Sequence, residues 1–184
     1  MVNKHRIITA FFLICSLLFF LAGISETLKR YKTIEVPQTT SNVGYNRLRI
    51  AKLNVDLPIF PGAVTDGLLS TIDYGVQTLE HPKTGTNLII YGHNWPNLFG
   101  TLNKLQKGDA IVIISDVGVQ RLFLVEGSYE VTPNQTHVTK QTQDKRITLI
   151  TCSGFMDSKR LIVVGKLVTT TTAATTLDSQ VEGL

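Results

Sequence analysis

Cysteine is scarce in this sequence. The 184 residues include only Cys15 and Cys152, which excludes a disulfide-stapled mini-protein and a zinc site ligated by cysteines. Charge is sparse as well: 17% of the residues are charged, the net charge is +4, and no long block of like charge occurs. Nucleic-acid binding depends on clustered lysine and arginine, so we expect no nucleic-acid partner. The H-E-x-x-H, G-x-S-x-G and Gly-rich phosphate-binding motifs are absent, no acidic cluster stands out, and we predict neither a metal site nor a cofactor.

One long hydrophobic run, from Ile7 to Ile24, contains 18 residues without a charge. At about 1.5 Å per residue, a helix of this length spans roughly 27 Å, close to the thickness of the bilayer's hydrocarbon core. The short basic stub before it would suit a cleaved signal peptide too, but no clear A-x-A cleavage site follows. We therefore predict a single-pass signal-anchor over residues 1–25, with the N-terminus cytoplasmic and the rest of the chain outside the cell membrane.

The remainder of the chain divides into three parts by composition. Residues 26–45 are polar, have no hydrophobic period, and are predicted to form a stalk. Residues 46–168 carry the hydrophobic runs of one folded domain. Residues 169–184 are rich in threonine and are predicted to be a disordered tail.

The folded domain has the pattern of an all-β structure. Short runs rich in β-branched residues, bounded by Gly, Asp, Asn or Pro, predict strands, and Asp116-Val-Gly118 predicts a hairpin loop between two of them. Helical signals are few: residues 65–73 and 96–105 could each form a turn or two. Many short strands with little helix favour a closed barrel or a sandwich. The predicted strands are residues 48–53, 87–91, 110–114, 119–125, 146–151 and 161–167.

Cys152 is the only cysteine in this domain, and it directly follows the predicted strand 146–151. It is either a small buried hydrophobe or a nucleophile, and position alone leaves both open. A cysteine nucleophile needs a proton partner and a group that stabilises the oxyanion. Arg160 begins the next strand, and if the two strands pair, its guanidinium comes near the sulfur. Taken alone, Arg160 is better interpreted as a solvated charge at a strand end, beside Lys159.

Histidine is the natural proton partner for a thiol near neutral pH. His93 follows the apolar strand 87–91, and Gly92 permits a sharp exit from it. A titratable group that a rigid strand delivers to a barrel rim suits general acid work. His81 and His137 fall in predicted loops, and we prefer His93 to both.

Together these segments resemble the sortase family, the membrane-anchored cysteine transpeptidases of bacterial surfaces. Thr148-Leu-Ile-Thr-Cys152 is similar to the family's T-L-x-T-C signature, which suggests a housekeeping, class A or E-like enzyme over a pilus polymerase. The order of histidine, cysteine and arginine after an N-terminal anchor is also shared. The resemblance implies an eight-stranded closed β-barrel with one or two short helices. The other matching segments are residues 87–93, 102–112 and 159–167.

The resemblance also implies an activity. Cys152 would be the nucleophile, His93 the general acid and base, and Arg160 the oxyanion and positioning group. The substrates would be surface proteins with a C-terminal LPxTG-type sorting motif, cleaved between Thr and Gly through a thioester. An amine acceptor of the cell wall, such as a peptidoglycan precursor, would then take the acyl group.

The sequence neighbours of these residues are candidate substrate contacts. Asn94 and Trp95 follow His93, and Thr151 and Ser153 flank Cys152. For the first two, a simple turn and an apolar anchor are equally good interpretations.

Two other functions remain open from the sequence. The chain could be a cysteine hydrolase or an L,D-transpeptidase acting on peptidoglycan, although in the latter family the cysteine follows His-Gly and precedes an arginine two residues on. Cys152 is followed instead by Ser-Gly. The chain could also be a non-catalytic, membrane-tethered β-domain in which Cys152 is packed and inert.

Overall fold

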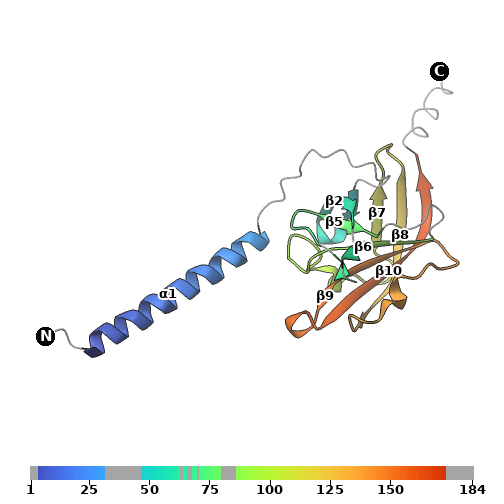
Figure 1. Ribbon diagram of the computed structural model, residues 1–184. Helices are drawn as coiled ribbons and strands as arrows, with labels where there is room; N and C mark the ends of the chain where they lie inside the picture. The colour runs from blue at the N-terminus through green and yellow to red at the C-terminus, as the bar shows by residue number, and fades with distance from the viewer. Residues whose placement is uncertain are drawn as a thin grey trace, which may run out of the picture. The chain divides into compact units, whose positions relative to one another are not determined.

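A computed structural model describes residues 4–31, 47–62, 64–65, 68–69, 71–79 and 86–172 of the chain. The chain divides into two units, residues 1–33 and residues 34–184, and the first contains the helix α1, Lys4–Tyr31 (Figure 1). The sequence predicted a membrane-spanning helix from Ile7 to Ile24. A helix is present there, but among the described residues none was found both long and apolar enough to cross a membrane.

α1 is longer at its C-terminal end than the apolar run that predicted it. Its last six residues, 26–31, belong to the segment that the sequence assigned to the stalk. This stretch contains leucine, lysine, arginine and glutamate, which are good helix formers. The rest of the predicted stalk, residues 32–45, lies outside the described residues.

The second unit contains a closed barrel of eight strands in the order β1-β2-β5-β6-β9-β10-β8-β7. The barrel is mixed, because β2 pairs with β5 and β6 with β9 in parallel, whereas the other neighbours are antiparallel. The predicted closed eight-stranded barrel is thereby confirmed. The strands are β1 (Arg47–Ile50), β2 (Val55–Pro61), β5 (Val76–Thr78), β6 (Asn87–Tyr91), β7 (Ala110–Ile114), β8 (Gln120–Val131), β9 (Arg146–Ser153) and β10 (Lys159–Thr171).

Of the two predicted helical segments, the first differs from the structure and the second contains a helical turn. Within residues 65–73, a small antiparallel sheet of β3 (Val64–Thr65) and β4 (Leu68–Leu69) replaces the expected helical turns. Val64 is paired with Leu69 and Thr65 with Leu68, so strand pairing outweighs the helical pattern of this segment. Within residues 96–105, only a short 3-10 helix forms. The described 3-10 helices are η1 (Ala51–Leu53), η2 (Leu102–Lys104), η3 (Thr136–Thr139) and η4 (Phe155–Asp157).

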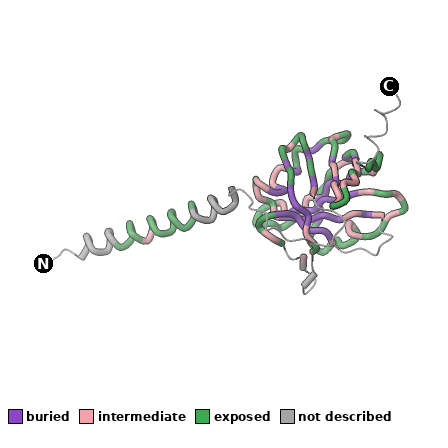
Figure 2. The backbone as a smooth tube through the Cα atoms, turned by 90° about the horizontal axis from the view of Figure 1, so that it is seen from above, coloured by how far each residue is buried: buried purple, intermediate pink, exposed green. Residues whose placement is uncertain are grey.

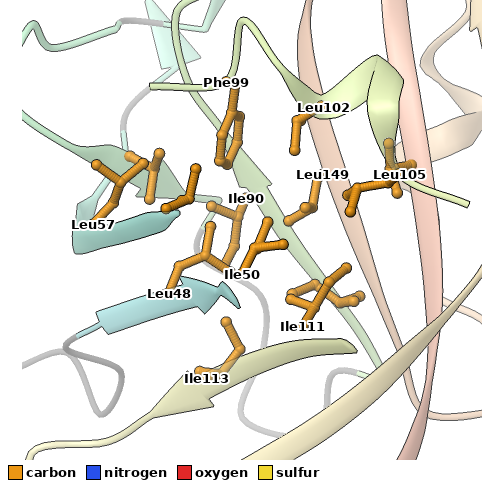
Figure 3. Packing of buried hydrophobic residues seen from close by; sticks show 14 of the residues in the cluster. Leu48, Ile50, Leu57, Ile90, Phe99, Leu102, Leu105, Ile111, Ile113 and Leu149 are labelled. Atoms are coloured by element: carbon orange, nitrogen blue, oxygen red, sulfur yellow. The ribbon is translucent and has the colours of Figure 1, made fainter. Parts of the chain in front are cut away.

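The barrel is filled by a cluster of buried aliphatic and aromatic side chains from its strands and from the segment that contains η2. Figure 3 shows Leu48, Ile90, Phe99 and Leu149 in this cluster, all completely buried. Figure 2 shows buried backbone running through the barrel strands. Burial of each such side chain contributes about 1.5–3 kcal/mol, so this interior cluster holds the strands, and anything mounted on them, in fixed register.

β10 continues beyond the predicted end of the folded domain. Residues 169–171, assigned from the sequence to the tail, pair with residues 120–122 of β8. Threonine is β-branched and favours strands, and β8 offers free ladder positions at this point. The threonine run is therefore structured at its start, while the predicted tail beyond Thr172 lies outside the described residues.

Candidate active site

Three neighbouring strands carry the three residues that the sequence singled out. β9 lies between β6 and β10 in the barrel order (Figure 1). Cys152 on β9 is directly opposite Arg160 on β10, and directly opposed residues have Cβ atoms about 4.5–5.5 Å apart. On the other side, Tyr91 of β6 is paired with Ile150 of β9. His93 is two residues beyond Tyr91, as Cys152 is two residues beyond Ile150, so all three lie at the same end of these strands.

The hydrogen bonding between β6 and β9 continues past the last residue of β6. The backbone N–H of Gly92 donates to the carbonyl of Ile150 at 3.2 Å. The hydroxyl of Thr151 donates to the carbonyl of Gly92 at 2.9 Å. These two bonds join the residue before His93 to the two residues before Cys152, which fixes the relative position of the candidate acid and the candidate nucleophile along the strands.

Cys152 and Arg160 project from the outer face of the barrel wall. Alternation along a strand places Cys152 on the face of Ile150, and Arg160 on the face of Ile162. Both isoleucines belong to a second apolar group, separate from the interior cluster, which we call the outer cluster. Its buried members are Ile89, Tyr91, Val131, Ile150 and Ile162. The site is therefore mounted beside an apolar surface, whose low polarity strengthens electrostatic interactions.

The Cys152 thiol is half-buried, and its environment acts on its acidity in opposite directions. Burial raises the pKa of Cys152, the positive charge of Arg160 lowers it, and the negative charge of Asp157 raises it further. The net pKa is higher than that of a free cysteine. Near neutral pH the thiol is therefore mostly neutral, and the thiolate that attacks a carbonyl is the minor form.

The His93 ring has partners at its face and at its edge. Trp95 stacks on it, with ring centroids 4.4 Å apart and planes within 7° of parallel. The Nε2 atom lies 3.4 Å from Oδ1 of Asp73, in the segment before β5. Sequence reasoning missed Asp73, because no motif surrounds it and its approach depends on how the chain reaches β5.

Arg160 is held by the turn that precedes it. Its Nη1 donates to the backbone carbonyl of Asp157 at 2.9 Å and to the backbone carbonyl of Lys159 at 2.8 Å. Met156 and Asp157 both adopt left-handed backbone conformations, with φ of 50° and 58°. This unusual turn directs the Asp157 carbonyl toward the guanidinium, so the arginine head group has a defined position next to β9.

The four predicted substrate contacts occupy different environments. Asn94 is exposed, while Trp95 is half-buried and lies against His93. Thr151 is 3% exposed, and its hydroxyl is engaged inside the wall. Ser153 is half-buried and, by alternation, on the opposite face of β9 from Cys152.

His137 is exposed on η3, whereas His81 lies outside the described residues. In the described ranges, no group of three or more His, Cys, Asp or Glu side chains has an arrangement that could hold a metal ion.

Comparisons with known proteins agree with this architecture. Residues 48–168 match the sortase domain family. Sortase A of Listeria monocytogenes is 27% identical over 153 residues, covering 74% of this chain and 67% of that protein. Its crystal structure has a TM-score of 0.61 at 27% identity, covering 76% of this chain and 97% of that one. Sortase C1 of Streptococcus agalactiae has a TM-score of 0.58 at 28% identity, with 67% of each chain covered. For sortase A of Corynebacterium diphtheriae the TM-score is 0.59 at 28% identity, with 72% and 64% covered.

Proposed function

Because the chain belongs to the sortase family of cysteine transpeptidases, we propose that it cleaves an LPxTG-type sorting motif between Thr and Gly and transfers the protein to a cell-wall amine. The observation that carries this proposal is the direct pairing of Cys152 with Arg160 across β9 and β10. His93 ends the neighbouring strand at the same level. A nucleophile, an oxyanion stabiliser and an acid from three adjacent strands are what acyl transfer through a thioester requires.

Each residue has a defined role in the proposed reaction. The Cys152 thiolate adds to the threonine carbonyl carbon, and Arg160 stabilises the negative charge on the carbonyl oxygen. The C–N bond then breaks, and protonated His93 gives its proton to the departing glycine amine. A thioester joins the substrate to Cys152. An acceptor amine attacks this thioester, passes a proton to neutral His93, and releases the thiolate with a new amide.

The reactive protonation state is a minor one in this proposal. A free thiol has a pKa near 8.5 and a free imidazole near 6.5, so the pair of thiolate and imidazolium is already uncommon. Burial raises the pKa of Cys152 and makes the pair rarer still, while Arg160 acts in the opposite direction. The observed rate should therefore depend strongly on every charge next to the sulfur or the imidazole.

We also propose that residues 1–25 anchor the enzyme in the cell membrane, with the barrel outside the cell. The apolar run from Ile7 to Ile24 supports this, and the large apolar side chains from Phe11 to Ile24 of α1 are exposed to between 40% and 81%. Exposed apolar surface of this extent is favourable against lipid. Substrates that carry a C-terminal sorting motif would meet the barrel at the same membrane. The Thr148–Cys152 motif supports a housekeeping role in anchoring surface proteins.

The test is to trap the thioester. The full chain in detergent is incubated with an LPxTG peptide and hydroxylamine, and peptide hydroxamate and the acylated enzyme are measured by mass spectrometry. We expect an adduct on Cys152, a hydroxamate product, and neither with Cys152→Ala. Cleavage that persists in Cys152→Ala, or a Cys152 that resists alkylation in the native protein, would contradict the proposal.

A second arm separates transfer from hydrolysis. Cleavage is measured with and without an oligoglycine or a peptidoglycan-precursor amine, and a transpeptidase should form the new amide at the expense of the free acid. If the acid remains the product at all amine concentrations, the chain is a cysteine hydrolase. A peptide library in the same assay then determines the variable positions of the motif.

A further inference from the structure

We propose that Asp73 and Trp95 form a clamp that stabilises the protonated form of His93 and fixes its ring plane. The inference rests on the proposed catalytic role of His93. Trp95 would then act as a positioning residue for the acid, in addition to or in place of a substrate contact. Asp73 would be a positioning residue that acts entirely through the imidazole.

The clamp holds the ring in two independent directions. Trp95 lies parallel to the imidazole, with centroids 4.4 Å apart, so it restricts the tilt of the ring. Asp73 approaches the edge, with Oδ1 at 3.4 Å from Nε2. Both contacts favour the imidazolium over the neutral ring, because a carboxylate attracts the positive charge and so does the electron-rich face of an indole.

Each partner is itself supported by neighbouring structure. Trp95 packs against the interior cluster and accepts backbone hydrogen bonds from Leu98 and Gly100 at its carbonyl, at 2.9 and 2.8 Å. Next to Asp73, the ring of Tyr74 packs edge-on against Phe60 of β2, with centroids 5.3 Å apart. The Asp73 side chain is 73% exposed, so its effect on the imidazole is that of a surface ion pair and should be modest.

Other charges also surround this end of the strands, and they must be separated from the clamp. In the described part of the chain they include Cys152 on β9, Arg160 on β10 and Asp157 in the turn between these strands. They also include Lys159 of β10, which forms an ion pair with Glu130 of β8 at 2.8 Å. Arg160 and Asp157 act on the Cys152 thiol. Among the described residues, Asp73 places a carboxylate oxygen next to the imidazole itself.

The clamp makes a specific prediction for the pH profile of kcat/KM. Between the acidic limb, set by the imidazolium, and the alkaline limb, set by the thiol, the active pair is a constant fraction of the enzyme. Asp73→Asn should lower this plateau by about two- to fivefold, the range for an exposed ion pair. The acidic limb should move to lower pH, so that its midpoint falls at a proton concentration higher by the same factor. Below the acidic limb the imidazole is protonated in both proteins, so their rates should converge. A purely structural defect would instead lower the rate at every pH.

The second measurement does not depend on catalysis. In a Cys152→Ala background, the protonation of His93 is followed by NMR of the labelled imidazole, with and without Asp73→Asn. We expect the titration midpoint to move to lower pH in the double variant. An unchanged midpoint would overturn the clamp, whereas a wild-type chain that cleaves no sorting peptide would overturn the proposed function and leave this titration intact.

Two further variants serve as controls. Asp116→Asn removes a carboxylate in the turn between β7 and β8, at the far end of β8 from the site, and should leave both profiles unchanged. Trp95→Phe retains an aromatic face and should retain most of the plateau, whereas Trp95→Leu should reduce it. Equal loss in both Trp95 variants, with matching loss of thermal stability, would show that Trp95 acts only through packing.

Discussion

Two of the turns between antiparallel neighbours in the barrel differ in their backbone: residues 115–119 between β7 and β8, and residues 154–158 between β9 and β10. In the first, the N–H of Ser115 donates to the carbonyl of Val119 at 2.8 Å, and only Gly118 has a positive φ, of 77°. The sequence predicted this hairpin loop, and it is confirmed. The second turn also uses a glycine, Gly154 at φ 74°, but adds Met156 and Asp157 in left-handed conformations.

The second turn is costly by local criteria. A non-glycine residue in the left-handed region costs roughly 1–2 kcal/mol, and this turn contains two. Phe155 and Met156 are also large apolar residues that are 86% and 85% exposed. The compensation lies at the site, because the carbonyl of Asp157 accepts a hydrogen bond from Arg160. Of these two turns, the one that orients a reactive group contains the strain, and the one that only connects strands does not. Asn54, between β1 and β2, is the other described non-glycine residue with a positive φ, of 53°, but asparagine tolerates this conformation.

The largest expected difference between the two ends of β8 and β10 is in catalysis. Arg160→Ala should lower kcat/KM by about 10²–10³-fold, the usual loss when one oxyanion donor is removed. Its counterpart is Arg121→Ala, at the β7–β8 end of the barrel wall, which should change kcat/KM little. Both are measured by cleavage of a sorting peptide. Similar losses in the two variants would show that the arginine at the strained turn has no special role.

The same pair of variants also tests the electrostatics at the sulfur. Since Arg160 lowers the pKa of Cys152, Arg160→Ala should raise it and slow alkylation near neutral pH. The rate is measured with iodoacetamide in a Cys15→Ala background, which leaves one thiol. The alkylation rates of Arg160→Ala and of the chain that retains Arg160 should converge at a pH above the pKa of Cys152 in Arg160→Ala, because the thiol is then ionised in both.

The next effect concerns stability at the relaxed turn. Gly118→Ala forces a Cβ into a left-handed conformation and should lower the free energy of unfolding by about 1–2 kcal/mol. Urea denaturation of the full chain measures this change. The kcat/KM of the folded variant, measured without urea, should be unchanged. A loss of activity in the folded variant would show that the two turns are not functionally distinct.

At the strained turn the reverse substitution, to glycine, should change the free energy of unfolding in the opposite direction. Met156→Gly removes a non-glycine residue from a left-handed conformation, and should raise the free energy of unfolding by up to about 1 kcal/mol, less the entropy that glycine loses on folding. If the turn orients Arg160, the gain in stability should be accompanied by a lower kcat/KM. Higher stability with full activity would separate the strain from the function.

Much of this architecture is readable from the sequence because it follows from local pattern. β-branched runs predicted the barrel strands. The sequence placed Arg160 near Cys152 on the condition that their two strands pair, and the strands do pair. Three features depend instead on contacts between distant segments. Thr169–Thr171 becomes a strand because β8 lies beside it, and β3 and β4 pair where a helix was expected. Asp73 reaches His93 from a segment 20 residues earlier in the chain, which no spacing rule could indicate.

The smallest expected effect separates the side chain of the strained turn from its backbone. Asp157 raises the pKa of Cys152 through its charge, while its carbonyl holds Arg160. Asp157→Asn removes the charge only, because asparagine also tolerates left-handed conformations. The pKa of Cys152 should fall, so more thiolate is present near neutral pH and alkylation should be about twofold faster, a small factor because the charge is exposed. Asp116→Asn at the relaxed turn should change nothing. Slower alkylation in Asp157→Asn would mean that the turn had moved and released Arg160, and that the two contributions of Asp157 cannot be separated.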